Sequence, residues 1–212
     1  YIEKGYLRSG LINFLSLLGW HEKGDREIYN VEELIQAFSL DRVNKSGAIF
    51  DIEKLNWMNK IYLKDVKQSD LICAIKLLLQ KQKINISDNP TLEKMIDFAK
   101  FRVNTINEII DEIQCFLNYD KVDEKLLEIY NIKSLGKLWY SKLESIKAID
   151  ELHIKNIIGD SKAELNISGK NLFIPLRLIL IGKEHGPDLY SIINLLGKKE
   201  SLRRIKLNLN GK

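Results

Sequence analysis

The sequence predicts a mainly α-helical protein, in which a small mixed α/β-type domain precedes an all-α helical-bundle region of two subdomains. Between residues 92 and 113, apolar residues recur alternately every four and three positions, the spacing of one buried helix face. Helix-start and helix-breaker residues recur along the chain, and no convincing alternating strand pattern follows residue 65. The predicted domain ranges are 1–61, 62–120 and 121–212.

The first range is expected to hold short helices joined by brief extended links. One helix is predicted over 9–18, and Asn30 with Glu33 has the spacing of a capping box that starts another. The core face of that second helix is expected to be Leu34, Ile35 and Phe38. A loop with a short extended piece follows over 42–49, and Asp51 is expected to cap a further short helix.

The remaining ranges are expected to contain longer helices. A helix is predicted over 69–82, and a breaker over 87–91 precedes the apolar seam. The seam consists of Leu92, Ile96, Ala99, Val103, Ile106, Ile110 and Ile113. A second break at 118–121 separates it from helical runs expected over 123–132, 135–143, 146–158 and 175–206.

The composition bounds the class of protein. No run of about 18 apolar residues is present, and no signal peptide opens the chain, so a cytoplasmic protein without membrane contact is expected. Cys73 and Cys115 lack a CxxC companion and are expected to be buried structural residues. The net charge is +4, but from Ser161 onward 10 Lys and Arg stand against 4 Asp and Glu. This basic end suits a surface that follows phosphates, although a solvated helical face would carry the same charge.

The C-terminal stretch reads as a helix, a tight turn and a second helix. Pro175 is expected in the first turn of one helix, which Gly182 ends. Pro187 is expected at the first position of the next helix, which Gly197 ends. An ordinary helix-turn-helix packed in a bundle would have the same pattern.

Three ordered motifs resemble one family. Residues 175–198 contain Pro-Leu-Arg, then Gly-x-x-x-Gly-Pro-x-Leu, then Leu-Leu-Gly-Lys. This pattern resembles the C-terminal anticodon-binding region of bacterial glutamyl-tRNA synthetases. Residues 5–20 are similar to the segment that follows the signature loop of the catalytic half, and residues 42–59 resemble the stem-contact domain.

The resemblance implies a parent enzyme that attaches glutamate to tRNA(Glu) through a glutamyl-adenylate, with L-glutamate and ATP as its other partners. This chain would supply tRNA binding rather than catalysis, because residues of the Rossmann catalytic domain and its ATP motifs are missing. It is also expected to be a monomer. No catalytic residue, metal ligand or cofactor is therefore expected here, and ATP and Mg would belong to the catalytic domain. The piece by itself is expected to be inactive.

The family motif also assigns candidate contacts with the anticodon loop. Arg177 matches an Arg that faces this loop, and Leu189 matches an apolar position that contacts a base. Gly186 stands at a neighbouring contact position, where only its backbone could contact RNA. Lys183 and His185 could contact phosphate or simply be solvated. Unpaired bases suit such a set, since Arg can hydrogen-bond or stack on them while apolar groups cover a face.

Three further basic residues are candidates. Arg102 aligns with the Arg that, in discriminating enzymes, reads the third anticodon base and separates tRNA for Glu from tRNA for Gln. An ion pair between Arg102 and a carboxylate such as Asp97 is the alternative. Arg42 and Lys45 could contact the tRNA backbone below the acceptor arm.

Other functions stay open at this stage. A free-standing helical RNA-binding or interaction module without catalytic activity would have the same sequence pattern. So would a paralogue that charges a non-cognate tRNA, or an all-α scaffold.

Overall fold

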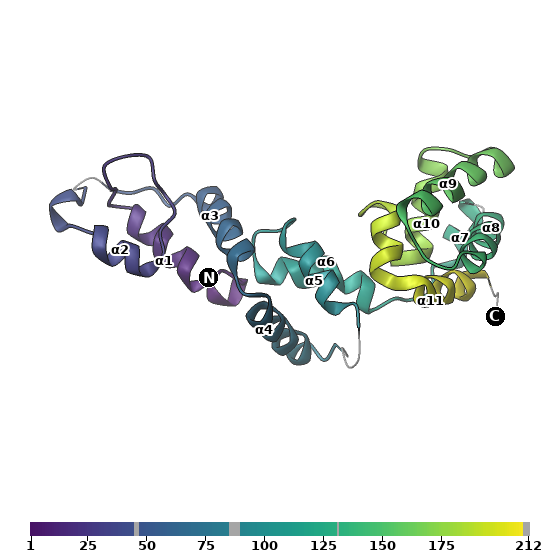
Figure 1. Ribbon diagram of the computed structural model, residues 1–212, viewed down its shortest axis with the longest axis horizontal. Helices are drawn as coiled ribbons and strands as arrows, with labels where there is room; N and C mark the ends of the chain where they lie inside the picture. Colours follow the sequence, from purple (N-terminus) through teal and green to yellow (C-terminus); the bar gives the residue numbers. More distant parts are fainter. Residues whose placement is uncertain (45–46, 85–89, 131, 210–212) are drawn as a thin grey trace. The chain divides into compact units, whose positions relative to one another are not determined.

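The computed structural model describes residues 1–44, 47–84, 90–130 and 132–209 (Figure 1). Within these ranges every regular element is a helix, and β pairing is limited to an isolated antiparallel bridge between Trp20 and Val43. The predicted mainly α class is confirmed. The extended piece expected over 42–49 is reduced, in the described part, to this bridge.

The chain forms two compact units. One takes in Tyr1–Ser87 and Leu92–Ile113, and the other is built mainly from Gln114–Lys212. The domain ranges 1–61, 62–120 and 121–212 stay predictions.

Where the structure describes the first unit, that unit contains two short 3-10 turns and the first six α-helices. The turns are Ile2–Lys4 and Leu40–Arg42. The helices are α1 (Arg8–Leu17), α2 (Val31–Ala37), α3 (Ile52–Asp65), α4 (Gln68–Lys81), α5 (Leu92–Lys100) and α6 (Ile106–Leu117), whose last turn belongs to the second unit.

Two predicted helix starts are confirmed in this unit. Asn30 Oδ1 accepts a hydrogen bond from the Glu33 amide (2.7 Å), and Glu33 Oε2 accepts one from the Asn30 amide (2.8 Å). Asp51 caps α3 by accepting from the amides of Glu53 and Lys54. Both signals could be recognised because their partners lie within three residues in the sequence.

Some predicted burial is wrong. Ile35 is 73% exposed, because the two-turn helix α2 directs only Leu34 into the core. Phe38 is 45% exposed and lies at 5.7 Å, centroid to centroid, from the Trp20 ring. Cys73 is exposed on α4, whereas Cys115 is buried as expected.

The apolar seam is interrupted between α5 and α6. Thr105 Oγ1 accepts from the Glu108 amide (3.3 Å), while Glu108 Oε2 accepts from the Asn104 amide (2.8 Å). This is close to a capping box, and Thr-x-x-Glu is its signature in the sequence. The seam is buried as predicted except at Ile106, which is half-buried; Val103, within the break, is buried. The breaker at 87–91 lies outside the described residues at 87–89.

The described residues of the second unit form a bundle of five helices, gathered in green and yellow in Figure 1. They are α7 (Glu124–Ile129), α8 (Ile132–Ser145), α9 (Glu151–Leu165), α10 (Lys170–Ile181) and α11 (Leu189–Leu209). Helix α11 packs on α8 and α10. The core that they enclose includes Ile132, Trp139, Leu172, Ile179, Ile192, Ile193 and Ile205.

The prediction for Pro175 is wrong. Helix α10 starts at Lys170, so Pro175 lies in its sixth position rather than in its first turn. The prediction that Gly182 ends the helix is confirmed, as its φ of 68° is left-handed. Gly197, with φ 75° and ψ 161°, divides α11 into two helical segments, so it ends the first of them as predicted.

Candidate nucleic-acid interface

The turn between α10 and α11 forms the centre of the candidate interface. The Gly182 amide donates to the Leu178 carbonyl (2.9 Å), which closes α10. Asp188 begins α11, because its carboxylate accepts from the Ser191 amide (2.9 Å) and from Ser191 Oγ (2.6 Å). Partial burial raises the pKa of Asp188, but these hydrogen bonds outweigh burial and hold that pKa below its usual value.

The predicted place of Pro187 is therefore wrong. The side chain of Asp188 takes the N-cap, so the first helical residue is Leu189 and Pro187 precedes the cap. Asp is a strong N-cap residue, and it competes here with the preference of Pro for the first turn.

Arg177 is held against this turn. Its Nε donates to the Pro187 carbonyl (3.1 Å), and its guanidinium lies 5.8 Å from the centroid of the Phe173 ring. The residue is half-buried. Within the described part of the chain it makes no other hydrogen bond, and a guanidinium has five N–H donors, so the remaining donors can serve a ligand.

A cavity of about 330 Å³ lies beside Arg177. Its walls come from α9, α10 and the start of α11. They comprise Glu151, Ile154, Lys155, Ile158, Phe173, Arg177, Asp188, Leu189 and Tyr190. Such a lining combines two aromatic side chains, aliphatic side chains and charged groups of both signs, the residue types that bind a planar ring and hydrogen-bond its edge.

The other candidate residues of this region lie close by. Leu189 lines the cavity but is only 3% exposed, so any contact with a base would use a small part of its surface. Lys183, His185 and Gly186 are exposed in the turn itself. A Cβ on Gly186 would lie 3.0 Å from Cδ1 of Ile181, so the turn is closely packed at this position.

Arg102 belongs to the other compact unit. It follows α5, is exposed, and has its guanidinium 5.1 Å from the centroid of the Phe98 ring. Its Nε lies 3.9 Å from Glu112 Oε2. The alternative partner Asp97 is instead paired with Lys100 (2.9 Å). Arg102 therefore has a carboxylate neighbour, but at a distance typical of a weak surface pair.

Of the two remaining basic candidates, Arg42 and Lys45, the structure describes only Arg42. Arg42 donates from Nη2 to the Ala37 carbonyl (3.0 Å), and its guanidinium lies 5.8 Å from the centroid of the Trp20 ring. Lys45 lies outside the described residues. In the described ranges, no three His, Cys, Asp or Glu side chains gather as a metal site, and no helix is long and apolar enough to cross a membrane.

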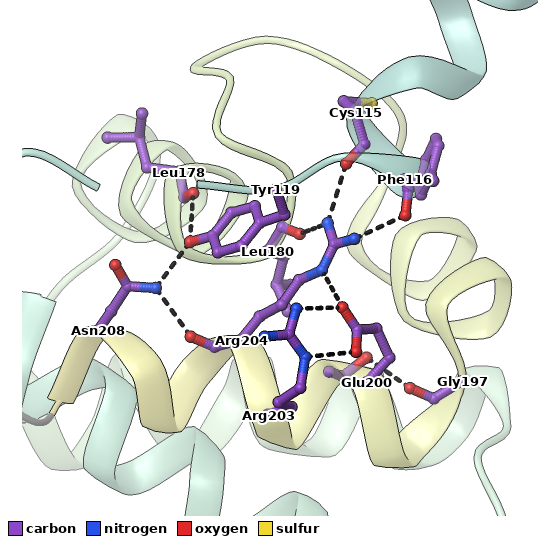
Figure 2. Close-up of polar contacts among 11 residues, drawn as sticks. Cys115, Phe116, Tyr119, Leu178, Leu180, Gly197, Glu200, Arg203, Arg204 and Asn208 are labelled. Atoms are coloured by element: carbon purple, nitrogen blue, oxygen red, sulfur yellow. Dashed lines mark hydrogen bonds and ion pairs between the residues drawn. The ribbon is translucent and has the colours of Figure 1, made fainter. Parts of the chain in front are cut away.

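A buried arginine that supports this region was not predicted from the sequence (Figure 2). Arg204 is 1% exposed. Its guanidinium donates to the carbonyls of Cys115 (2.9 Å), Leu180 (2.7 Å) and Phe116 (2.6 Å), and to Glu200 Oε1 (2.7 Å). These carbonyls belong to the last turns of α6 and α10, which have no partners inside their own helices. A cation at this position also interacts favourably with the negative ends of two helix dipoles.

Tyr119 completes the buried cluster. The Arg204 guanidinium lies 4.6 Å from the centroid of its ring, and Asn208 Nδ2 donates to its hydroxyl (2.6 Å). That hydroxyl donates to the Leu178 carbonyl (3.3 Å), the same carbonyl that closes α10. Burial raises the pKa of Tyr119 to about 12, although Asn208 and Arg204 favour the ionised form.

An all-α bundle that presents a basic turn and an aromatic-lined cavity is suited to hold unpaired nucleotides. Residues 62–209 match the model of the family described as anticodon binding domain, and the chain therefore belongs to this family. Residues 1–57 match the model described as the catalytic domain of class I tRNA synthetases for E and Q. More particularly, the chain corresponds to the anticodon-binding C-terminal region of glutamate–tRNA ligases, as the resemblance predicted.

Similar proteins include the glutamate–tRNA ligase of Carboxydothermus hydrogenoformans, which is 37% identical over 97% of this chain and 45% of its own length. The glutamate–tRNA ligase of Wigglesworthia glossinidia brevipalpis is 35% identical over 98% of this chain and 44% of its own length. The chain thus spans less than half the length of these relatives.

A solved structure of a glutamate tRNA ligase from Elizabethkingia meningosepticum, in complex with its amino acid, is also similar. Its TM-score is 0.80 at 28% identity, over 97% of this chain and 41% of that one. The glutamate–tRNA synthetase of Elizabethkingia anophelis gives a TM-score of 0.76 at 28% identity, over 99% of this chain and 42% of that one. Both agree with the all-α architecture of this region.

Proposed function

We propose that this chain binds tRNA(Glu) and that the cavity beside Arg177 takes an unpaired anticodon base. The observation that carries the proposal is the cavity itself. Phe173 and Tyr190 offer ring faces for stacking, and Arg177 is already fixed at the edge with free donors. Base stacking on aromatic side chains contributes about 1–3 kcal/mol per base. Lys183 and His185, exposed in the adjoining turn, would contact phosphates, and the Gly186 backbone would contact the loop.

Arg102 is proposed to read the third anticodon base. Its pair with Glu112 is long and its side chain is exposed, so a base can replace the carboxylate at small cost. An Arg that binds a base edge through two parallel hydrogen bonds discriminates by about 1–3 kcal/mol. Arg42, whose guanidinium lies at the Trp20 ring, and Lys45 are proposed to contact the tRNA backbone.

The proposed parent protein is a monomeric, cytoplasmic ligase that joins glutamate to tRNA(Glu) with ATP. The relatives named above are glutamate–tRNA ligases, and this supports the ligase class. ATP and Mg would be held by the catalytic domain. The described residues offer no cluster that fits a metal ion, and no step of the ATP chemistry is placed on them. This part is proposed to be inactive by itself.

The test is the binding of this chain to transcribed tRNA(Glu) at a fixed, stated salt concentration. Wild type, Arg177→Ala and Arg102→Ala are each titrated with the native tRNA and with one whose third anticodon base is changed. Arg177→Ala is expected to lower the affinity for both tRNAs by about tenfold, the effect of losing 1.4 kcal/mol of binding free energy. Arg102→Ala is expected to lower the affinity for the native tRNA only.

Arg203→Ala is the matched control for charge, because Arg203 is an exposed arginine of the same unit as Arg177 and its ion pair among the described residues is with Glu200. An equal loss of tRNA affinity in Arg203→Ala and Arg177→Ala would mean that Arg177 contributes only through its positive charge and not through contact with a base. If wild type binds tRNA(Glu) no better than a random RNA of equal length, the proposed function is wrong.

A further inference from the structure

One buried side chain connects the beginning of the chain to the loop after Arg102. Asn59 lies within α3 and has no exposed surface. Its Oδ1 accepts from the Leu7 amide (2.8 Å), and its Nδ2 donates to the Asn104 carbonyl. Asn59 therefore fixes the start of α1 and the loop 101–105 relative to each other.

A second set of contacts joins the same two segments. The Ile106 amide donates to the Gly5 carbonyl (3.0 Å), and Asn107 Nδ2 donates to the Glu3 carbonyl (2.9 Å). Gly5 has a φ of 86°, and a Cβ on it would lie 2.7 Å from the Asn107 backbone nitrogen. Only glycine fits at that contact without displacing backbone, so the first turn lies directly against the start of α6.

The orientation of Arg102 depends on both segments. Its amide donates to the Ala99 carbonyl at the end of α5 (2.8 Å). Its guanidinium lies between Phe98 of α5 and Glu112 of α6. The direction of the side chain is therefore set by the angle at which α5 and α6 meet, and the contacts with Asn59 and Gly5 fix that junction.

We propose that Asn59 and Asn107 are positioning residues for Arg102. Recognition of a base by Arg102 would then be coupled to how firmly residues 1–7 are held in their folded conformation. The inference rests on the proposed role of Arg102. All these residues lie in one compact unit. The bonds from Ile106 to Gly5 and from Asn107 to Glu3 nevertheless join residues matched to the class I catalytic-domain model with residues matched to the anticodon-binding model, and Asn59 lies between the two matched ranges. The coupling thus crosses from one family segment to the other.

The first test uses Asn107→Ala, because Asn107 is only partly buried and the change removes one side-chain hydrogen bond. Binding to tRNA(Glu) and to the tRNA with its third anticodon base changed gives a discrimination ratio. We expect a wild-type ratio of at least about fivefold, the low end of base readout. Asn107→Ala is expected to bring this ratio towards one while leaving affinity for the changed tRNA and the melting temperature near wild type.

Asn194→Ala, an exposed Asn of the second unit, is the matched control and should keep the wild-type ratio. A purely structural role for Asn107 would lower both affinities or the melting temperature without changing the ratio. Either that result or an unchanged ratio in Asn107→Ala would overturn the proposal.

A second measurement needs no variant. Hydrogen exchange of the Leu7 and Ile106 amides in wild type should slow more with native tRNA(Glu) than with the changed tRNA. Equal slowing with both tRNAs would overturn the coupling while leaving base reading by Arg102 intact. If wild type binds both tRNAs equally, the role of Arg102 fails first and the coupling fails with it.

Discussion

Arg203 and Arg204 are neighbours in the sequence and share Glu200, but their surroundings differ. Arg203 is an exposed side chain that pairs with both oxygens of Glu200 at 2.7 Å. Arg204 is buried and donates to three backbone carbonyls as well. At Arg204 the loss of the side chain leaves buried carbonyls and part of the Glu200 charge without a partner, whereas at Arg203 water replaces it.

Arg204→Met is therefore expected to lower the free energy of unfolding by about 3–5 kcal/mol, the cost of breaking a buried charged network. Arg203→Met is expected to cost about 1 kcal/mol or less, as for an exposed ion pair. Urea unfolding of both variants measures the difference. Equal losses would mean that the carbonyl contacts add little to stability.

This contrast also explains what the sequence could predict at the level of residues. The caps Asn30 and Asp51 were predictable because their partners lie within three positions. The partners of Arg204 lie up to 89 residues away, so two adjacent arginines have no local signal that separates them. The candidate residues Arg177, Gly186 and Leu189 could be proposed from the sequence because one short motif contains them.

Two glycines within helical elements show opposite backbone requirements. Gly197 has a φ of 75° at the division of α11, where a Cβ is strained whatever space surrounds it. Gly159 lies inside α9 with ordinary helical geometry, and nothing lies within 4 Å of a Cβ placed on it.

Gly197→Ala is expected to destabilise the second unit by about 1–2 kcal/mol. Gly159→Ala is expected to stabilise it by up to about 1 kcal/mol, because Ala loses less backbone entropy in a helix. Thermal unfolding of both variants would check the signs. A destabilising Gly159→Ala would show that α9 needs glycine for a reason other than space or φ.

The errors at the level of elements have a common cause. Pro175 and Pro187 were each assigned to the first turn of a helix, where proline is preferred. At both places the helix starts at another residue: α10 begins after Gly169, whose φ of 54° is left-handed, and Asp188 caps α11. A preference for one position decides a boundary only when no stronger cap competes within a few residues.

The whole molecule has two compact units with separate cores. Leu55 and Met58 are completely buried in the first, and Trp139 and Ile205 are completely buried in the second. Cores that share few residues need not lose their packing together.

We therefore expect the two units to lose hydrogen-exchange protection at different urea concentrations. Mass spectrometry of peptides from α3 and from α8 would report the two transitions separately. One coincident transition for both peptides would contradict this expectation and would indicate a single cooperative structure.

The bond from Arg177 to the Pro187 carbonyl has a consequence for the thermodynamics of RNA binding. A free arginine side chain has about 2 kcal/mol of rotamer entropy, and most of it is lost when the guanidinium is immobilised on a ligand. Arg177 has already given up part of this freedom in folding, since its own turn holds it. A nucleotide that enters the cavity meets a preorganised donor, and a larger share of the new hydrogen-bond energy remains as affinity.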